Sequence, residues 1–146
     1  MHKDFYASGF IYHQKTQQIL LQQVNSDDET PVWSLLSEKG AINKAGEEIF
    51  KDLSYKQLKL KLNIKHIHLI YTYFSQETNK NHNIYYAEVT KLHKIPSSKK
   101  ITFSWFTFKQ IGKLNLLKQT KQDIVIGQRV IQSAVRKVLG ERTIEE

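Results

Sequence analysis

The segment from Trp33 to Ile64 constrains the fold more than any other part of this chain. It reads WSLLSEKGAINKAGEEIFKDLSYKQLKLKLNI, in which a glycine-bearing turn and a Gly-Glu-Glu step precede a long amphipathic stretch. Ile49, Phe50 and Leu53 lie on one helical stripe, and the stretch after them is rich in leucine and lysine, which are good helix formers. We therefore predict a helix from about Glu47 to Leu62.

The end of this helix is ambiguous. From Leu58 to Ile64, apolar residues alternate with polar ones, and a period of two favours a strand. Leu58 and Leu62 are also spaced i, i+4, as on one face of a helix. Periodicity alone leaves both alternatives open for this stretch.

Short strands and two further helices are predicted around this segment. The predicted strands are Phe5–Tyr12, Gln18–Val24, 67–73, Ile84–Thr90 and Ile101–Phe106. The first two are separated by five residues, 13–17, and read as a hairpin. Thr107 is placed to cap a short helix that runs to Leu114. A last helix is predicted from Thr120, with Asp123 completing a capping box, to Gly140.

Composition indicates one folded domain. The chain has 146 residues, 40% hydrophobic and 25% charged, so we expect a single domain over 1–146 with 141–146 as a flexible tail. It has no cysteine, which excludes disulfides and thiolate metal sites. The N-terminal residues lack the apolar stretch of a signal peptide, and we expect a cytoplasmic protein. The formal net charge of +8 favours anionic partners.

The whole pattern resembles the Nudix hydrolases, whose signature is a loop–helix–loop written G-x5-E-x7-R-E-U-x-E-E-x-G-U, where U is a bulky aliphatic residue. Trp33–Ile64 resembles this Nudix box in degenerate form, and the segments 7–11 and 18–23 look like the first two Nudix strands. Residues 104–111 look like the late strand-to-helix turn. The resemblance covers roughly the whole chain. It implies an α/β (α+β) fold, in which a mixed β-sheet is sandwiched between helices.

The resemblance also implies a site, and its metal ligands are missing. In the family, glutamates of the R-E-U-x-E-E helix hold divalent metals that bridge a substrate diphosphate and activate water. If Asn63-Ile64 is aligned with the terminal G-U, these six positions fall on Lys56, Gln57, Leu58, Lys59, Leu60 and Lys61. Mg²⁺ and Mn²⁺ prefer carboxylate oxygens, and a protonated lysine repels a cation. The alignment therefore predicts no metal cofactor, and Mg²⁺ or Mn²⁺ enters only if the chain is an active hydrolase.

Some polar residues of the box remain as candidates. Glu47 and Glu48 lie near the first glutamate of the box and are the candidate catalytic remnants, although acids in the first turn of a helix also stabilise its dipole. The distance from Gly40 to Glu48 is longer than the motif requires, which predicts an insertion in the loop. The candidate substrate-binding residues are Gly40, Lys56, Gln57, Lys61 and Glu88. A lysine could meet a phosphate directly in place of a metal.

Three functions are compatible with these residues. The first is a catalytically degenerate Nudix-fold protein that binds a nucleotide-like or phosphorylated ligand without hydrolysing it. The second is a divergent hydrolase for a nucleoside diphosphate-linked substrate, with a metal site relocated to Glu47, Glu48, Asp52 or Glu88. The third is a basic nucleic-acid-binding module, with strand tyrosines and Trp105 available for stacking. No membrane partner is expected, and a homodimer is compatible with the family.

Overall fold

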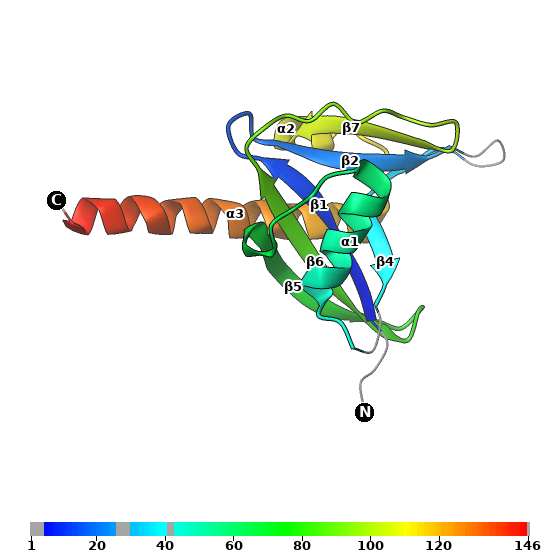
Figure 1. Ribbon diagram of the computed structural model, residues 1–146, viewed down its shortest axis with the longest axis horizontal. Helices are drawn as coiled ribbons and strands as arrows, with labels where there is room; N and C mark the ends of the chain where they lie inside the picture. The colour runs from blue at the N-terminus through cyan, green and yellow to red at the C-terminus, as the bar shows by residue number, and fades with distance from the viewer. Residues whose placement is uncertain (1–4, 26–29, 41–42, 146) are drawn as a thin grey trace.

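The computed structural model describes residues 5–25, 30–40 and 43–145, with side chains up to residue 139. Strands and helices follow the order that the sequence predicts, with additional short strands (Figure 1). The strands are β1 (Phe5–His13), β2 (Gln18–Val24), β3 (Trp33–Ser34), β4 (Leu36–Lys39), β5 (Ile67–Ser75), β6 (Lys80–Val89) and β7 (Ile101–Thr107). The helices are α1 (Gly46–Leu58), the 3-10 turn η1 (Ile64–His66), α2 (Phe108–Ile111) and α3 (Lys118–Glu145).

The seven strands form one mixed sheet that divides beside β1. β6 runs parallel to β1 along its whole length. On its other side, β1 pairs with β4 at Tyr6–Gly9 and with β2 at Ile11–His13, both antiparallel. β2 in turn pairs with β7, and β5 forms the other edge beside β6. β2 and β4 therefore occupy successive parts of the same edge of β1.

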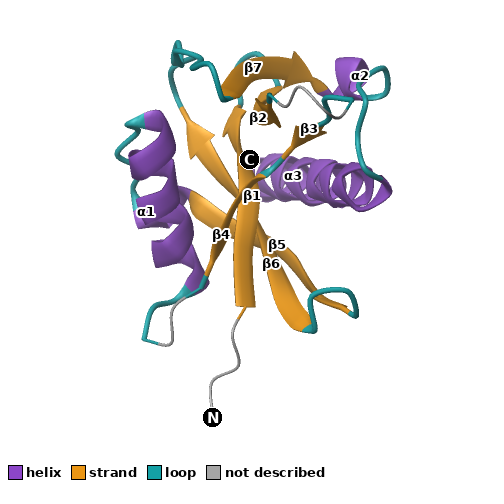
Figure 2. Ribbon diagram, turned by 90° about the vertical axis from the view of Figure 1, so that its right-hand side faces the viewer, coloured by secondary structure: helices purple, strands orange, loops and turns teal. Residues whose placement is uncertain are grey.

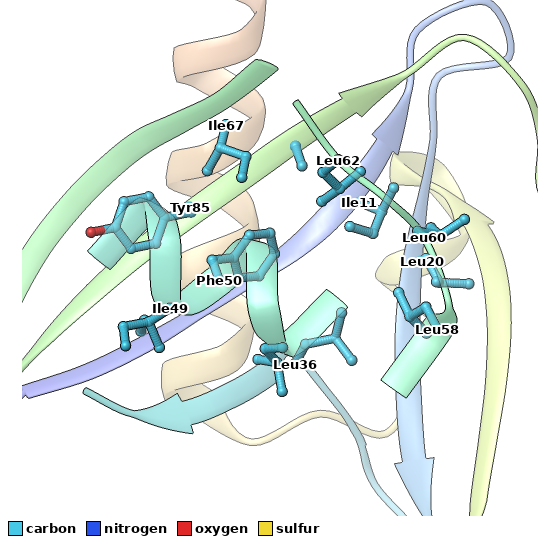
Figure 3. Packing of buried hydrophobic residues seen from close by; sticks show 13 residues of the cluster. Ile11, Leu20, Leu36, Ile49, Phe50, Leu58, Leu60, Leu62, Ile67 and Tyr85 are labelled. Atoms are coloured by element: carbon cyan, nitrogen blue, oxygen red, sulfur yellow. The ribbon is translucent and has the colours of Figure 1, made fainter. Parts of the chain in front are cut away.

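Helices cover both faces of the sheet, which confirms the predicted fold class (Figure 2). On the α1 face, Phe50 and Leu53 pack against Ile11, Leu20 and other strand residues (Figure 3). On the opposite face, Ile124 and Ile131 of α3 pack with strand residues that alternate with the first set. Strands buried on both faces carry apolar residues at consecutive positions, as Tyr85 and Tyr86 do here.

The predicted helix Glu47–Leu62 is correct for its first part and wrong for its end. α1 stops at Leu58, and Lys59 adopts a left-handed conformation with φ 59° and ψ 25°. Beyond it the chain is extended but belongs to no strand, so neither alternative for this stretch is fully right. Leu58, Leu60 and Leu62 are buried while the lysines between them are exposed. The period of two therefore reflects an extended segment that lies across the core (Figure 3).

The C-terminal predictions are also partly corrected. Thr107 caps α2 in a capping box with Gln110, but this helix ends at Ile111 and not at Leu114. α3 begins at Lys118, so Thr120 lies inside the helix and is not its cap. The helix does not end at Gly140 but continues to Glu145, through the range expected as a tail. The flexibility of that range stays a prediction.

Residues 26–29, between β2 and β3, lie outside the described residues. Among the helices that the structure describes, none has the length and apolar character needed to cross a membrane.

Candidate functional site

A cavity of 660 Å³ opens on the α3 face of the sheet, beside the short strands β3 and β4. Its wall combines three serine hydroxyls from β1, β3 and β4 with the turn between β5 and β6 and the first turns of α3. The residues that line it include Ser34, Ser37, Tyr73, His82, Lys118 and Asp123. Elements distant in sequence thus contribute polar groups to one cleft, which we call the α3 cleft.

Asp123 is the most unusual residue of the α3 cleft, because it is an acid with only 4% of its surface exposed. Its Oδ1 atom accepts hydrogen bonds from the hydroxyl of Tyr71 and from Nε2 of Gln119, the latter at 2.9 Å. Gln119 Nε2 also lies 3.1 Å from the Tyr71 hydroxyl, which closes a three-membered network. Among the described residues, none donates a hydrogen bond to Oδ2. One carboxylate oxygen therefore lines the cleft without a partner.

The surroundings of Asp123 alter several pKa values. Burial raises the pKa of Asp123 above its ordinary value, against the opposing effect of the hydrogen bonds from Tyr71 and Gln119. Burial also raises the pKa of Tyr73 to about 12, with a smaller contribution from the charge of Asp123. Burial lowers the pKa of His82, although the nearby Asp123 opposes this shift. His82 is therefore favoured in its neutral form.

Aromatic rings form one wall of the α3 cleft. His82 stacks between Tyr6 and Tyr73, with ring centroids 4.9 Å apart on both sides and interplanar angles of 20° and 8°. Nε2 of His82 lies 2.9 Å from the Thr78 hydroxyl, which orients the ring. Tyr71 extends the aromatic row, with its centroid 5.6 Å from that of Tyr73. Because His82 is stacked on both sides and Tyr73 lies between His82 and Tyr71, these rings contribute their edges to the cleft.

The end of α1 changes the alignment with the Nudix box. The box places glycine directly after the helix, and Lys59 holds the left-handed position there that glycine normally favours. Asn63, in contrast, lies beyond the helix and caps η1. With Lys59-Leu60 as G-U, the R-E-U-x-E-E positions become 52–57 and the first glutamate becomes Lys44. Three residues then separate Gly40 from Lys44 where the motif has five, so this loop is two residues shorter than the motif and not longer, as the sequence alone predicted.

The new alignment still leaves the glutamate positions without carboxylates, because they are Leu53, Lys56 and Gln57. Leu53 is 1% exposed and packs in the core. The first glutamate of the box is replaced by Lys44 and its arginine by Asp52, so the two charges are exchanged. Lys44 and Asp52 form an ion pair, with 3.0 Å between Nζ and Oδ2. In the described part of the chain, no group of three His, Asp or Glu residues could hold a metal ion. This donor set does not fit the family's metal cluster.

The sequence-predicted candidates are scattered. Glu47 and Glu48 lie in the first turn of α1, and Glu48 is exposed. Gly40 packs against Phe5, where a side-chain carbon would approach the ring to 2.5 Å. Lys61 and Glu88 line a separate cavity of 310 Å³, and Glu88 lies 3.6 Å from Nε2 of His68.

Lys56 and Gln57 line neither this cavity nor the α3 cleft. Lys56 Nζ lies 3.9 Å from Glu38 Oε2 on the surface, and Oε1 of Gln57 is buried without a hydrogen-bond partner among the described residues. Of the tyrosines considered for base stacking, Tyr85 and Tyr86 are buried in the two cores. The residues that do converge were not recognised as a site from the sequence, and Asp123 was interpreted as part of a helix cap.

Comparison with known proteins shows a common fold at low sequence identity. No family model and no curated protein matches the chain. The NUDIX domain of Shewanella oneidensis NrtR complexed with ADP ribose superposes with a TM-score of 0.69 at 11% identity, covering 90% of each chain. A C. elegans Ap4A hydrolase binary complex gives 0.66 at 10% identity, covering 90% of this chain and 99% of that one. A mutT/nudix family protein from Listeria innocua gives 0.66 at 11% identity, with 92% and 98% covered.

Proposed function

We propose that this Nudix-fold chain binds a nucleotide-like ligand in the α3 cleft and does not hydrolyse it. The observation that carries the proposal is the buried carboxylate of Asp123, which has one oxygen open to a 660 Å³ cavity. Both hydrogen bonds from Tyr71 and Gln119 go to Oδ1, so a ligand N–H group could donate to Oδ2. The Nudix-fold neighbours bound to ADP ribose or described as an Ap4A hydrolase complex support an adenine nucleotide as this ligand.

The polar groups of the cleft suit the two ends of such a ligand. The amino group of an adenine ring would donate to Oδ2 of Asp123, with the base packed against the ring edges of Tyr73 and His82. The phosphates would lie toward Lys118 and the first turn of α3, where the helix dipole favours negative charge. The hydroxyls of Ser34 and Ser37 are further donors along this path.

Absence of hydrolysis is supported by the residues at the box positions. Diphosphate hydrolysis in this fold needs metal ions to neutralise phosphate charge and activate water. Lys44, Leu53, Lys56 and Gln57 stand at the glutamate positions. Leucine and protonated lysine cannot coordinate a hard cation, and Gln57 offers only a neutral amide oxygen in place of a carboxylate. The divergent-hydrolase alternative relies on Glu47, Glu48, Asp52 or Glu88, but Asp52 pairs with Lys44 and Glu88 lies beside His68.

The proposal is tested by calorimetric titration of the chain with ADP-ribose in EDTA, followed by assay of AMP release with Mg²⁺ and with Mn²⁺. We expect saturable one-to-one binding without metal, and no AMP release. AMP release that disappears in a Glu47→Gln/Glu48→Gln variant would contradict the proposal and identify a divergent hydrolase. If neither ADP-ribose, AMP nor diadenosine tetraphosphate binds, the assignment of the cleft fails.

A matched ligand pair tests the role of Asp123 without mutation. AMP carries an amino donor at the position where IMP carries a carbonyl acceptor. Because the acceptor would face the open carboxylate oxygen, we expect IMP to bind at least about tenfold more weakly than AMP. Equal affinity would show that Asp123 does not contact this edge of the base.

A further inference from the structure

Helix α3 continues far beyond the sheet that supports it (Figure 1). In the described part of the helix, the last buried side chain is Ile131, and every residue from 132 to 139 is exposed. The remainder of the helix is about 21 Å long at a rise of ~1.5 Å per residue. Helices of this length are marginal in water unless an apolar face packs against a partner surface. The exposed β-branched Val135 and Val138 further lower its intrinsic helix propensity.

Two hollows flank the point where α3 leaves the sheet. One, of 490 Å³, lies between α3, the turn after β1 and the start of α2, and the other, of 350 Å³, lies between α3 and β6. Both contain Tyr12, Ile131 and Val135, so they share one apolar floor. The ring of Tyr12 is held in place by Phe108 and Tyr86, with centroids 6.0 and 6.4 Å away. The floor is therefore a preformed part of the core.

The charges around this floor are mainly positive. Among the side chains that the structure describes, which end at residue 139 of this helix, Lys109 and Arg136 line the larger hollow and no acidic one does. Within the same range, Glu88 is the one charged side chain of the smaller hollow, and it lies beside His68. If a second copy of the chain packed here through the same surface, both copies would bring Lys109 and Arg136 to the interface. Charge complementarity therefore favours an acidic partner over self-association.

We propose that this surface binds an acidic amphipathic helix of another protein. The surface, which we call the α3 root, consists of Tyr12, Lys109, Ile131, Val135, Arg136 and Val138. Apolar residues of the partner fill the two hollows on either side of Val135, and its carboxylates meet Lys109 and Arg136. This is helix-in-groove recognition, in which anchors at i, i+3 or i+4 and i+7 enter a preformed apolar surface. Binding would also give the projecting part of α3 the packing that it lacks.

The test uses the full chain and a fluorescent synthetic helix of about 15 residues, with leucine on one face and glutamate on the flanks. A second peptide keeps the leucines and replaces each glutamate with lysine. Fluorescence anisotropy gives the Kd, and methyl resonances of Val135 and Val138 report the place of contact. We expect the glutamate peptide to bind with shifts at these methyls, and the lysine peptide to bind at least about tenfold more weakly.

Two charge-reversal variants decide between the α3 root and the general basic surface. Arg136→Glu is expected to weaken binding of the glutamate peptide by about five- to tenfold. Arg129→Glu makes the same charge change on an exposed position of α3 that lines neither hollow, and should leave the Kd nearly unchanged. Equal losses in both variants, or no binding at all, would overturn the proposal. A dimer of the chain that Val135→Glu converts to monomers would overturn it in favour of a second copy.

Discussion

The hydroxyl of Tyr71 donates a hydrogen bond to Oδ1 of Asp123 and joins β5 to the first turns of α3. A β-bulge makes this contact possible, because the register of β5 against β6 shifts between Leu69 and Tyr71. With regular alternation, Tyr71 would share the sheet face of Ile67, which packs on the α1 side. The extra residue moves Tyr71 and Tyr73 to the α3 side and so creates the aromatic wall.

Burial of Asp123 predicts a pH-dependent stability. Because its folded pKa is raised above 3.8, the folded state binds the proton more tightly than the unfolded state. The contribution of Asp123 to the free energy of unfolding is therefore most favourable below pH 3.8. It falls as the pH rises through the raised pKa of the folded state. Asp123→Asn removes this loss, so the variant should match the parent in acid and be more stable at neutral pH. Urea denaturation at both pH values measures the difference, and a variant that is less stable at neutral pH would contradict this.

The left-handed conformation of Lys59 predicts a stabilising substitution. Glycine adopts this conformation without steric cost, so Lys59→Gly should raise the free energy of unfolding by about 0.5–1 kcal/mol. The gain is limited because the Lys59 ammonium lies 5.8 Å from the ring centre of Tyr55. Lys61→Gly is the control, since Lys61 is exposed and has no positive φ, and it should lower stability. Equal effects of the two variants in chemical denaturation would refute this account of the helix end.

Two glycines should respond in opposite directions to alanine. A side-chain carbon at Gly127 would lie 3.0 Å from both Ile70 Cδ1 and Phe10 Cζ, between α3 and the sheet. Because these neighbours are buried, Gly127→Ala should lower the free energy of unfolding by about 1 kcal/mol. At Gly112 the nearest atom would be 3.9 Å away and the backbone is right-handed, so Gly112→Ala should be neutral or stabilising. Thermal denaturation of both variants measures this, and a stabilised Gly127→Ala would show that α3 is less closely packed.

Divalent metal should not stabilise the chain. Lys44, Lys56 and Leu53 occupy the glutamate positions of the structure-based alignment, so we expect the same melting temperature in MnCl₂ and in EDTA. A rise in melting temperature with Mn²⁺ that Glu48→Gln abolishes would contradict this and return the metal site to the start of α1.

Much of the fold could be predicted from the sequence, because it depends on local patterns. The β1–β2 hairpin and the start of α1 follow from alternation and helical spacing, and Thr107 was recognised as a helix cap. The short strands β3 and β4 were missed, since two and four residues are too few to show a period. The end of α1 was missed because Lys59 takes a conformation for which lysine gives no signal.

The α3 cleft could not be predicted, because its residues converge through tertiary structure. Asp123 and Thr120 have the spacing of a capping box, but α3 begins at Lys118 and leaves Asp123 inside the helix. Its partner Tyr71 reaches it only through the bulge in β5. The absence of carboxylates from the glutamate positions of the R-E-U-x-E-E segment, in contrast, can be read from the sequence. It holds whether Asn63-Ile64 or Lys59-Leu60 is aligned with the terminal G-U.

The measurement that tests the central claim most directly is the affinity of the parent and of Asp123→Asn for ADP-ribose in EDTA. The substitution keeps an oxygen to accept from Tyr71 and Gln119, and replaces Oδ2 with an NH₂ donor. Asp52→Asn, the same change on the exposed face of α1, is the control. We predict a Kd at least about tenfold higher for Asp123→Asn, with the control unchanged and the fold intact. Equal affinity of parent and Asp123→Asn would contradict the assignment of the α3 cleft as the ligand site.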